Sequence, residues 1–319
     1  MAYTVSPVQH TIADRIDLSG IGVHSGEKVS LSLLPADVNT GINFVRTDLP
    51  AHQQVDIPAL SSAVAATDLC TILGDPASAH VKTVEHLMAA LMGMGLDNVL
   101  VEVDNPEIPV LDGSSEEFVD AILSVGLKAQ GRSRRRLRVL REVHVPMGNS
   151  WGTFTPHECP RFEVEIDFDD EVIGRQSYAV DLTPESFAKD VSRARTFGFM
   201  KDVESYWAAG FALGSSLENS VVIGEDNTIV NPEGLRYENE FVRHKLLDAV
   251  GDLALAGAPI MGCFQSYRGG HKLNAIALEA LLSDPANYEW IGEEVVTGPR
   301  ASRVELVSVK APAFAPDKS

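Results

Sequence analysis

One short segment pairs a histidine with a carboxylate in a pattern that suits a metal ion. His244 and Asp248 lie four residues apart in a stretch with helical apolar periodicity. Their side chains therefore leave the same face of the expected helix. An imidazole nitrogen and a carboxylate oxygen are two of the three protein ligands of a catalytic zinc site. A charged stripe on a surface helix gives the same spacing, and the pair alone favours that interpretation.

A second histidine, His86, stands beside Glu85 at the start of another strongly apolar helical segment. His86 would supply the third ligand of a zinc hydrolase, and Glu85 the base. Neighbouring helical residues point about 100° apart, so one can hold metal while the next reaches its bound water. A helix-start glutamate beside a satisfied histidine is the alternative, and it is the commoner case for such a segment alone.

A third histidine, His271, follows two glycines after an expected strand. We expect it on a loop that approaches a ligand closely, where it could act as a general acid; an exposed loop histidine is the ordinary alternative. No His-Glu-x-x-His motif is present, and three cysteines are too few for a cysteine-rich structural zinc site. The residues alone therefore indicate only a possible mononuclear hydrolase site assembled from two halves of the chain.

The elements of the first half follow from periodicity and turn residues. Residues 29–33 alternate apolar with polar side chains, residues 83–93 have helical periodicity, and residues 99–103 form a short apolar run. We interpret these as a strand, a helix and a strand. Ser114, with Glu117 three residues later, predicts a capping box that opens another helix.

The second half repeats this scheme loosely. Residues 162–168 alternate as a half-buried strand, and Thr183 followed by proline opens a helix. A long apolar-periodic helix over 241–256 is followed by an apolar strand over 259–264. Because strands outnumber βαβ signals, we expect an α+β fold of two similar layered domains.

The boundary between these domains is predicted near residues 128–136, where glycine, serine and a run of arginines change the composition. We assign 1–130 to the N-terminal domain and 131–319 to the C-terminal domain. The arginine run is interpreted as a solvated linker and not as a binding segment.

Composition excludes several classes of protein. The 319 residues include 26 Lys plus Arg against 45 Asp plus Glu, and a net charge of -19 repels a nucleic-acid backbone. No apolar run reaches the roughly 18 residues of a membrane span, and the start lacks signal-peptide features. Three widely spaced cysteines indicate free thiols in a reducing compartment. We expect a cytoplasmic protein that does not span the membrane.

Several motifs along almost the whole chain share residues and order with one known family. They are Gly20-Ile21-Gly22-Val23-His24-Ser25-Gly26, Thr83-Val84-Glu85-His86-Leu87, Asn105-Pro106-Glu107-Ile108-Pro109 with Asp112-Gly113-Ser114, Ser192-Arg193-Ala194-Arg195-Thr196-Phe197-Gly198-Phe199, Glu240-Phe241-Val242-Arg243-His244-Lys245 with Asp248, and Gly270-His271. On these motifs the chain resembles the UDP-3-O-acyl-N-acetylglucosamine deacetylases, the zinc amidases of lipid A biosynthesis.

The resemblance implies a fold and a reaction. The fold is two domains of similar topology, each a sheet layered with helices, packed with the helices between them and the active site at their junction. The reaction removes the N-acetyl group from UDP-3-O-(3-hydroxyacyl)-N-acetylglucosamine and releases acetate, the committed step of lipid A biosynthesis.

The resemblance also implies a ligand set and a base. His86, His244 and Asp248 match the ligands of one catalytic Zn²⁺, although two histidines and one aspartate also suit iron(II). Glu85 matches the general base that takes a proton from the zinc-bound water. The metal lowers the pKa of that water toward about 7.

Five further positions match residues that act on the substrate or on its neighbours. Thr196 matches the hydroxyl that binds the oxyanion, and His271 a protonated imidazole that stabilises charge and protonates the leaving amine. Asp252 matches the carboxylate that orients His271. Lys245 matches a contact to the diphosphate or sugar. Arg268 stands near the expected UDP site, where relatives often carry lysine.

Residues 197–222 match an inserted unit that forms an apolar passage for the acyl chain. Its apolar side chains belong to Phe197, Phe199, Met200, Val203, Phe211, Ala212, Leu217 and Val222. In a generic protein such residues would be ordinary core, and the resemblance favours the passage for the unit as a whole.

Two alternatives remain beside the deacetylase. One is a metalloamidase on the same scaffold that acts on another acylated sugar. The other is a nucleotide-sugar-binding protein without catalysis, which the presence of Glu85, His271 and all three ligands disfavours. We expect a monomer whose only partner is the small-molecule substrate.

Overall fold

The computed structural model describes residues 6–292 and has the mixed α+β fold expected from the sequence. The strands are β1 (Val8–Ile12), β2 (Ile16–Ile21), β3 (Lys28–Pro35), β4 (Ile42–Arg46), β5 (Ile57–Pro58), β6 (Val64–Ala66), β7 (Ile72–Gly74), β8 (His80–Lys82), β9 (Val99–Val103), β10 (Leu127–Ser133), β11 (Arg136–Val139), β12 (Val143–Met147), β13 (Ser150–Thr155), β14 (Pro160–Asp167), β15 (Arg175–Asp181), β16 (Phe197–Phe199), β17 (Val221–Ile223), β18 (Ile260–Tyr267) and β19 (Tyr288–Ile291). The helices are η1 (Ser61–Ala63), α1 (Glu85–Gly93), α2 (Glu116–Val125), α3 (Pro184–Asp190), α4 (Met200–Ala208), α5 (Glu240–Leu253), η2 (Ala254–Ala256) and α6 (His271–Ser283).

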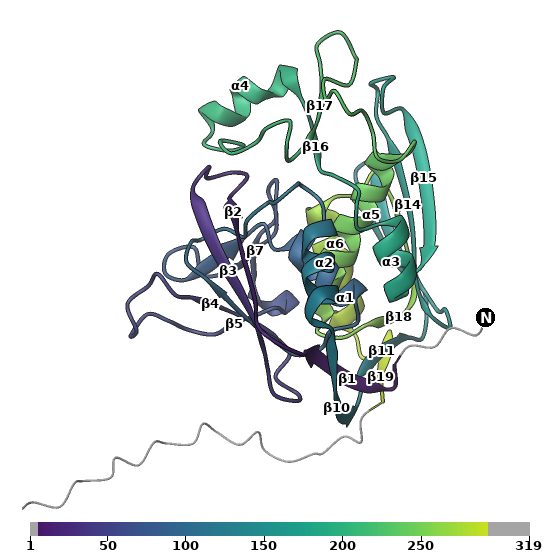
Figure 1. Cartoon of the computed structure of the whole chain (residues 1–319). Helices are drawn as coiled ribbons and strands as arrows, with labels where there is room; N and C mark the ends of the chain where they lie inside the picture. Colours follow the sequence, from purple (N-terminus) through teal and green to yellow (C-terminus); the bar gives the residue numbers. More distant parts are fainter. Residues whose placement is uncertain (1–5, 293–319) are drawn as a thin grey trace, which may run out of the picture.

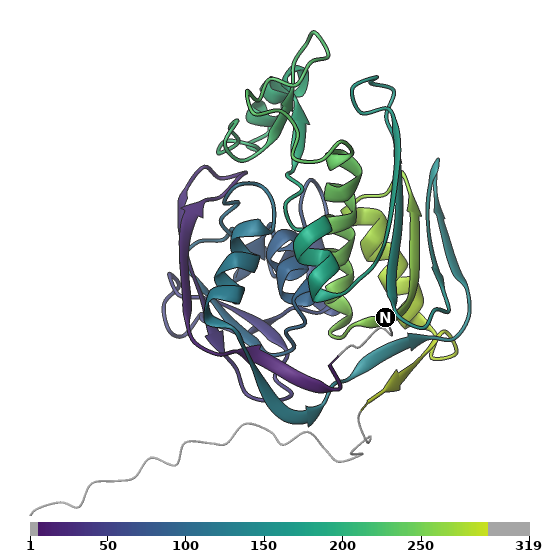
Figure 2. The ribbon, with the colours of Figure 1, turned by 45° about the vertical axis from the view of Figure 1, so that its right-hand side comes forward.

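Two larger sheets stand on either side of the central helices (Figures 1 and 2). One has the order β2-β3-β9-β4-β5. In the other, β18 pairs antiparallel with β13 and parallel with β11 and β14, while β12, β15 and β19 extend this sheet. Smaller sheets are formed by β6-β7-β8, β1-β10 and β16-β17. The strands predicted over 29–33 and 99–103 are confirmed within β3 and β9. The strand predicted over 259–264 is confirmed as β18, which begins one residue later and continues to Tyr267.

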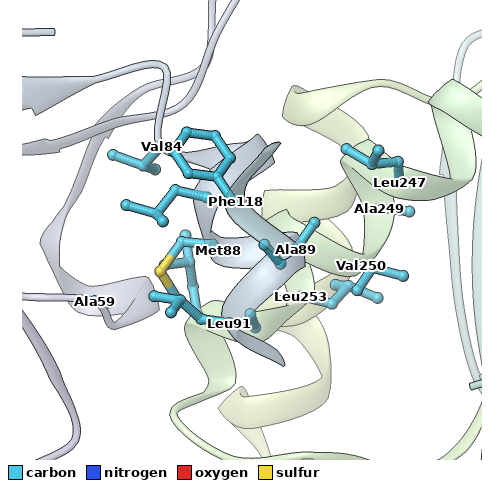
Figure 3. Packing of buried hydrophobic residues seen from close by; sticks show 14 of the residues in the cluster. Ala59, Val84, Met88, Ala89, Leu91, Phe118, Leu247, Ala249, Val250 and Leu253 are labelled. Atoms are coloured by element: carbon cyan, nitrogen blue, oxygen red, sulfur yellow. The ribbon is translucent and has the colours of Figure 1, made fainter. Parts of the chain in front are cut away.

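Helices α1 and α5 pack directly against each other at the centre of the molecule. Met88 and Leu91 of α1 and Val250 and Leu253 of α5 are buried in one apolar cluster (Figure 3). Gly251 makes the approach possible, because a Cβ atom there would lie 2.0 Å from the backbone oxygen of Glu85. The first turn of α1 therefore lies against the C-terminal half of α5.

The two helix caps predicted from the sequence have different outcomes in the structure. Thr183 caps α3 as predicted, since its hydroxyl accepts the N–H of Ser186 at 2.9 Å. The capping box predicted at Ser114 is wrong: α2 begins at Glu116, and its N-cap makes no side-chain cap bond. Ser114 instead donates to the carboxylate of Asp112 and accepts the N–H of Glu116.

The arginine run does not form a solvated linker throughout. Residues 127–133 form β10, which pairs antiparallel with β1, and Arg134 is only 5% exposed. The Arg134 Nε atom lies 2.7 Å from Asp97 Oδ1. The linker interpretation is therefore wrong for Arg134, because a counter-charge from the loop after α1 allows it to be buried.

A unit formed by β16, α4 and β17 projects from the rest of the molecule at the top of Figure 1. Its two strands pair in parallel, and none of the α4 residues is buried. Residues of α4 therefore reach solvent or line a surface cavity without entering the main core.

The structure bears on two expectations from the sequence, free cysteines and the absence of a membrane-spanning helix. Cys70, Cys159 and Cys263 are free and buried. Burial raises the pKa of the Cys70 thiol to about 12, so this thiol is neutral near pH 7. Within residues 6–292, no helix combines the length and apolar character that a membrane span requires.

Candidate metal centre and active site

The packing of α1 on α5 brings together the three residues predicted to be metal ligands. His86 is the second residue of α1, and His244 and Asp248 lie one turn apart on α5. Asp248 Oδ1 is 3.6 Å from His86 Nε2 and 3.4 Å from His244 Nε2. All three side chains are buried, and their ligand atoms lie within 4.8 Å of one another. Two nitrogens and one oxygen therefore converge on one point.

The protonation states at this point suit a cation. His244 Nδ1 lies 3.1 Å from the carbonyl oxygen of Ala194, so it donates there and leaves the Nε2 lone pair facing Asp248. Burial lowers the pKa of His244 to about 3, against the opposing effect of Asp248, and the imidazole is neutral. Burial works against ionised Asp248, yet the positive charge of Lys245 beside it holds its pKa well below the usual range.

The carboxylate of Asp248 has one oxygen available. Lys245 Nζ donates to Oδ2 at 2.9 Å, whereas Oδ1 has no hydrogen-bond partner in the described part of the chain. A buried, unpartnered carboxylate oxygen beside two imidazole nitrogens is unfavourable without a proton or a cation. The donor set and this orphaned atom fit a zinc-type divalent ion.

A buried glutamate fixes the entry to α1. Glu107 accepts the backbone N–H groups of His24 and Ser25, both at 2.8 Å, and the hydroxyl of Thr83 at 3.0 Å. Gly22 leaves room for this carboxylate, since a Cβ there would lie 2.2 Å from Glu107 Oε2. Thr83 has φ of 57°, a left-handed conformation that turns the chain into the helix. The glycine-rich motif thus holds the loop that orients Glu85 and His86.

Glu85 and His271 face each other beside the candidate metal site. His271 Nε2 is 3.8 Å from Glu85 Oε1, and His271 Nδ1 is 2.9 Å from Asp252 Oδ2. Although burial opposes its charged form, the carboxylates of Asp252 and Glu85 raise the pKa of His271 to about 10. Burial also raises the pKa of Glu85. At neutral pH His271 is therefore a cation hydrogen-bonded to Asp252.

The predicted loop position of His271 is wrong. His271 is the first residue of α6, and Gly270 is its N-cap. The two glycines end the connection from β18 immediately before the helix, so the imidazole is held by a regular element.

Two residues of this network were not found from the sequence. The Thr71 hydroxyl donates to Asp252 Oδ1 at 2.6 Å, and its N–H donates to Glu85 Oε2 at 3.1 Å. Asn274 Nδ2 donates to Asp252 Oδ2 at 2.9 Å. Asn274 follows His271 by three residues on one helix, which is a usable signal. Thr71 has none, because its partner Asp252 is 181 positions away.

A cavity of about 480 Å³ opens over these groups and extends along the projecting unit. Predicted site residues that line it are Glu85, His86, Thr196, Phe197, Phe199, Val203, Ala212, His244, Lys245, Asp248 and His271. Met200 and Leu217 do not line it and are 46% and 39% exposed. Arg268 lines a neighbouring hollow, which shares Lys245 with this cavity.

The projecting unit is joined to the cavity wall at two places. Thr196, which precedes β16, donates its N–H to the carbonyl of Gly113 at 2.8 Å. Gly214 donates to the carbonyl of Val23 at 3.0 Å, and the rings of His24 and Phe211 lie edge to face at 5.3 Å. The loop motif that holds Glu107 therefore also contacts the unit.

Fold and site together define a class: a mixed α+β protein with a candidate mononuclear metal centre of two histidines and one aspartate. The family model of the UDP-3-O-acyl N-acetylglycosamine deacetylases, LpxC, matches residues 9–283. Proteins described as UDP-3-O-acyl-N-acetylglucosamine deacetylase from Brucella ovis, Brucella canis and Brucella melitensis are each 56% identical over 283 residues. These matches span 89% of this chain and 98% of each relative. The chain belongs to the UDP-3-O-acyl-N-acetylglucosamine deacetylase family.

Proposed function

We propose that one Zn²⁺, held by His86, His244 and Asp248, serves the hydrolysis of the N-acetyl group of UDP-3-O-(3-hydroxyacyl)-N-acetylglucosamine, which releases acetate in the committed step of lipid A biosynthesis. The observation that carries this proposal is the approach of Asp248 Oδ1 to both histidine Nε2 atoms, at 3.4 and 3.6 Å. Family membership supplies the substrate class.

The metal and the chain contribute different parts of the chemistry. Bound zinc supplies Lewis acidity, which polarises the amide carbonyl and makes water acidic near neutral pH. Glu85 removes a proton from the attacking water, and its buried position keeps it a stronger base than an exposed carboxylate. His271, cationic at neutral pH, donates a proton to the departing amine. Asp252 orients His271 through the bond to Nδ1.

The oxyanion needs a donor that is already in place. Thr196 lines the cavity with its backbone fixed on both sides, since its N–H bonds Gly113 and its carbonyl accepts the N–H of Val221 at 2.8 Å. We assign its hydroxyl to the oxyanion, because a preorganised donor stabilises developing charge without reorganisation.

The polar part and the acyl chain of the substrate contact different walls of the cavity. Lys245 faces both the cavity and the hollow that contains Arg268, so these cations suit the diphosphate or sugar. The acyl chain lies along Phe197, Phe199, Val203 and Ala212, where each buried methylene adds about 0.8 kcal/mol. Met200 and Leu217 contribute to the outer surface of this unit.

We assign the site to the junction of two similar domains, 1–130 and 131–319, with the acyl-passage unit at about 197–222. The packing of α1 on α5 supports this assignment, because α1 lies in the segment 1–130 and α5 in the segment 131–319. We also assign the protein as a cytoplasmic monomer whose partner is this small-molecule substrate. The monomer is supported by the three converging ligands, which all come from one chain.

The test is acetate release by chelator-treated protein, with and without one equivalent of zinc. We expect activity only with zinc. Activity without metal would overturn the metal assignment. Zinc binding without acetate release would instead favour another acylated sugar, which a substrate panel would identify.

A substitution tests whether Asp248 is a ligand of the metal that the reaction needs. Replacing Asp248 with alanine is expected to lower zinc occupancy and abolish acetate release together. Unchanged metal content in this variant would remove Asp248 from the ligand set.

A further inference from the structure

A second cavity, of about 390 Å³, lies at the other end of the α1–α5 pair. It shares no lining residue with the cavity over the metal ligands. Its walls include the C-terminal turns of α1, α2 and α5, the start of α3, and strands β10 and β14. Apolar side chains that line it include Met92, Leu123, Leu127, Phe162, Val250 and Leu253.

Two of these apolar side chains are exposed to solvent. Leu123 is 55% exposed and Leu127 is 37% exposed. Exposed apolar side chains that continue into a cavity of this size are typical of a ligand site.

One buried cation stands in this apolar wall. Arg134 lines the cavity and is 5% exposed. Its Nε atom is paired with Asp97, but Nη2 is buried and has no hydrogen-bond partner among the described residues. A buried N–H donor of a charged group without an acceptor is costly, so the site lacks one acceptor.

We propose that this cavity binds a long-chain aliphatic carboxylate, with its head group on Arg134 Nη2 and its alkyl chain on the apolar walls. A singly charged head group suits this position, because Asp97 already neutralises Arg134 in part and would repel a dianion such as a phosphate monoester. The apolar lining accounts for the chain. The arginine run thus contributes a binding residue, and this proposal does not depend on the reaction at the other cavity.

Calorimetric titration of the zinc-loaded full chain with dodecanoate tests the proposal, with dodecanol as the uncharged comparison. We expect one dodecanoate per chain and binding of dodecanol at least about tenfold weaker, since a hydrogen bond to a charged group contributes about 1.5–3 kcal/mol. Equal binding of the two compounds, or no binding of dodecanoate, would overturn the proposal.

Three variants locate the bound molecule. Arg134→Lys keeps a positive charge near Asp97 but loses the Nη2 donor, and Leu127→Trp fills the cavity from an exposed position. Both are expected to weaken dodecanoate binding about tenfold or more. Val203→Trp narrows the other cavity and is expected to leave binding unchanged. Loss of binding in Val203→Trp alone would place the molecule in the acyl passage and refute the second site.

Discussion

The metal-ligand region and the projecting unit line the same cavity but are built in opposite ways. His86, His244 and Asp248 are buried on two helices in direct contact, whereas α4 has no buried residue. Proton transfer and metal coordination depend on distances held within fractions of an ångström, which buried packing and satisfied hydrogen bonds provide. Contacts with an alkyl chain are non-directional, so an exposed unit is sufficient for them.

The largest effect is expected from substitution of the general base, Glu85. Glu85→Gln keeps the size of the side chain but removes its ability to take a proton, so turnover is expected to fall by about 10²–10⁴. Zinc content should not change, because Glu85 is not among the three converging ligands. Near-normal acetate release with full zinc occupancy would show that another group acts as base.

The second-largest effect is expected from removal of the oxyanion donor, the Thr196 hydroxyl. Thr196→Val replaces the hydroxyl with a methyl group of similar shape, and kcat is expected to fall by about 10²–10³ with little change in KM. Steady-state kinetics of acetate release measure both parameters. A rise in KM at constant kcat would instead make Thr196 a contact to the substrate's ground state.

Substitution of one glycine in each region compares how tightly the helix pair and the projecting unit are packed. Gly251→Ala places a Cβ 2.0 Å from the Glu85 carbonyl oxygen, and we expect a loss of about 1–3 kcal/mol in the free energy of unfolding. Gly198→Ala in β16 meets no atom within 4 Å, and its effect is expected to stay within about 0.5 kcal/mol. Urea unfolding measures both, and equal losses would contradict the difference in packing.

Charge near His271 sets the alkaline side of the pH profile. Asp252→Asn removes a negative charge that raises the pKa of His271 to about 10, leaving burial opposed mainly by Glu85. The pKa of His271 is then expected to fall. Since the proton on His271 is needed for reaction, the alkaline limb of kcat/KM should move to lower pH. An unmoved limb would show that His271 does not act as an acid.

Local signals predicted single elements well and long-range contacts poorly. The i,i+4 spacing of His244 and Asp248 and the cap at Thr183 depend on neighbouring residues, and both were found from the sequence. From the residues alone, His86 was only a candidate third ligand. Its position beside the other two was supported by the family motifs, because the packing of α1 on α5 has no local signal. Glu107 illustrates the same limit: it bonds Ser25, 82 positions away, and no spacing rule predicts this contact.

Buried charge was the other source of error. Arg134 was assigned to a solvated linker because arginine runs are usually exposed. Its burial depends on Asp97, which is 37 positions away. Met200 and Leu217 differ from Val203 and Ala212 for a related reason: apolar type alone does not show which face of a unit meets the cavity.

The smallest expected effect concerns the acyl chain, and it depends on which face of α4 meets the cavity. Val203 lines the cavity and Met200, on the same helix, does not. Val203→Trp is expected to shorten the passage and to move kcat/KM toward shorter acyl chains by about fourfold for each methylene excluded. Met200→Trp is the matched control and should leave the chain-length profile unchanged. The profile is measured as kcat/KM over substrates that differ only in acyl length. If both variants shift it equally, the passage would be a flexible surface instead of a wall with a defined inner face. If neither shifts it, the acyl chain would lie elsewhere in the cavity, and the projecting unit would not select chain length.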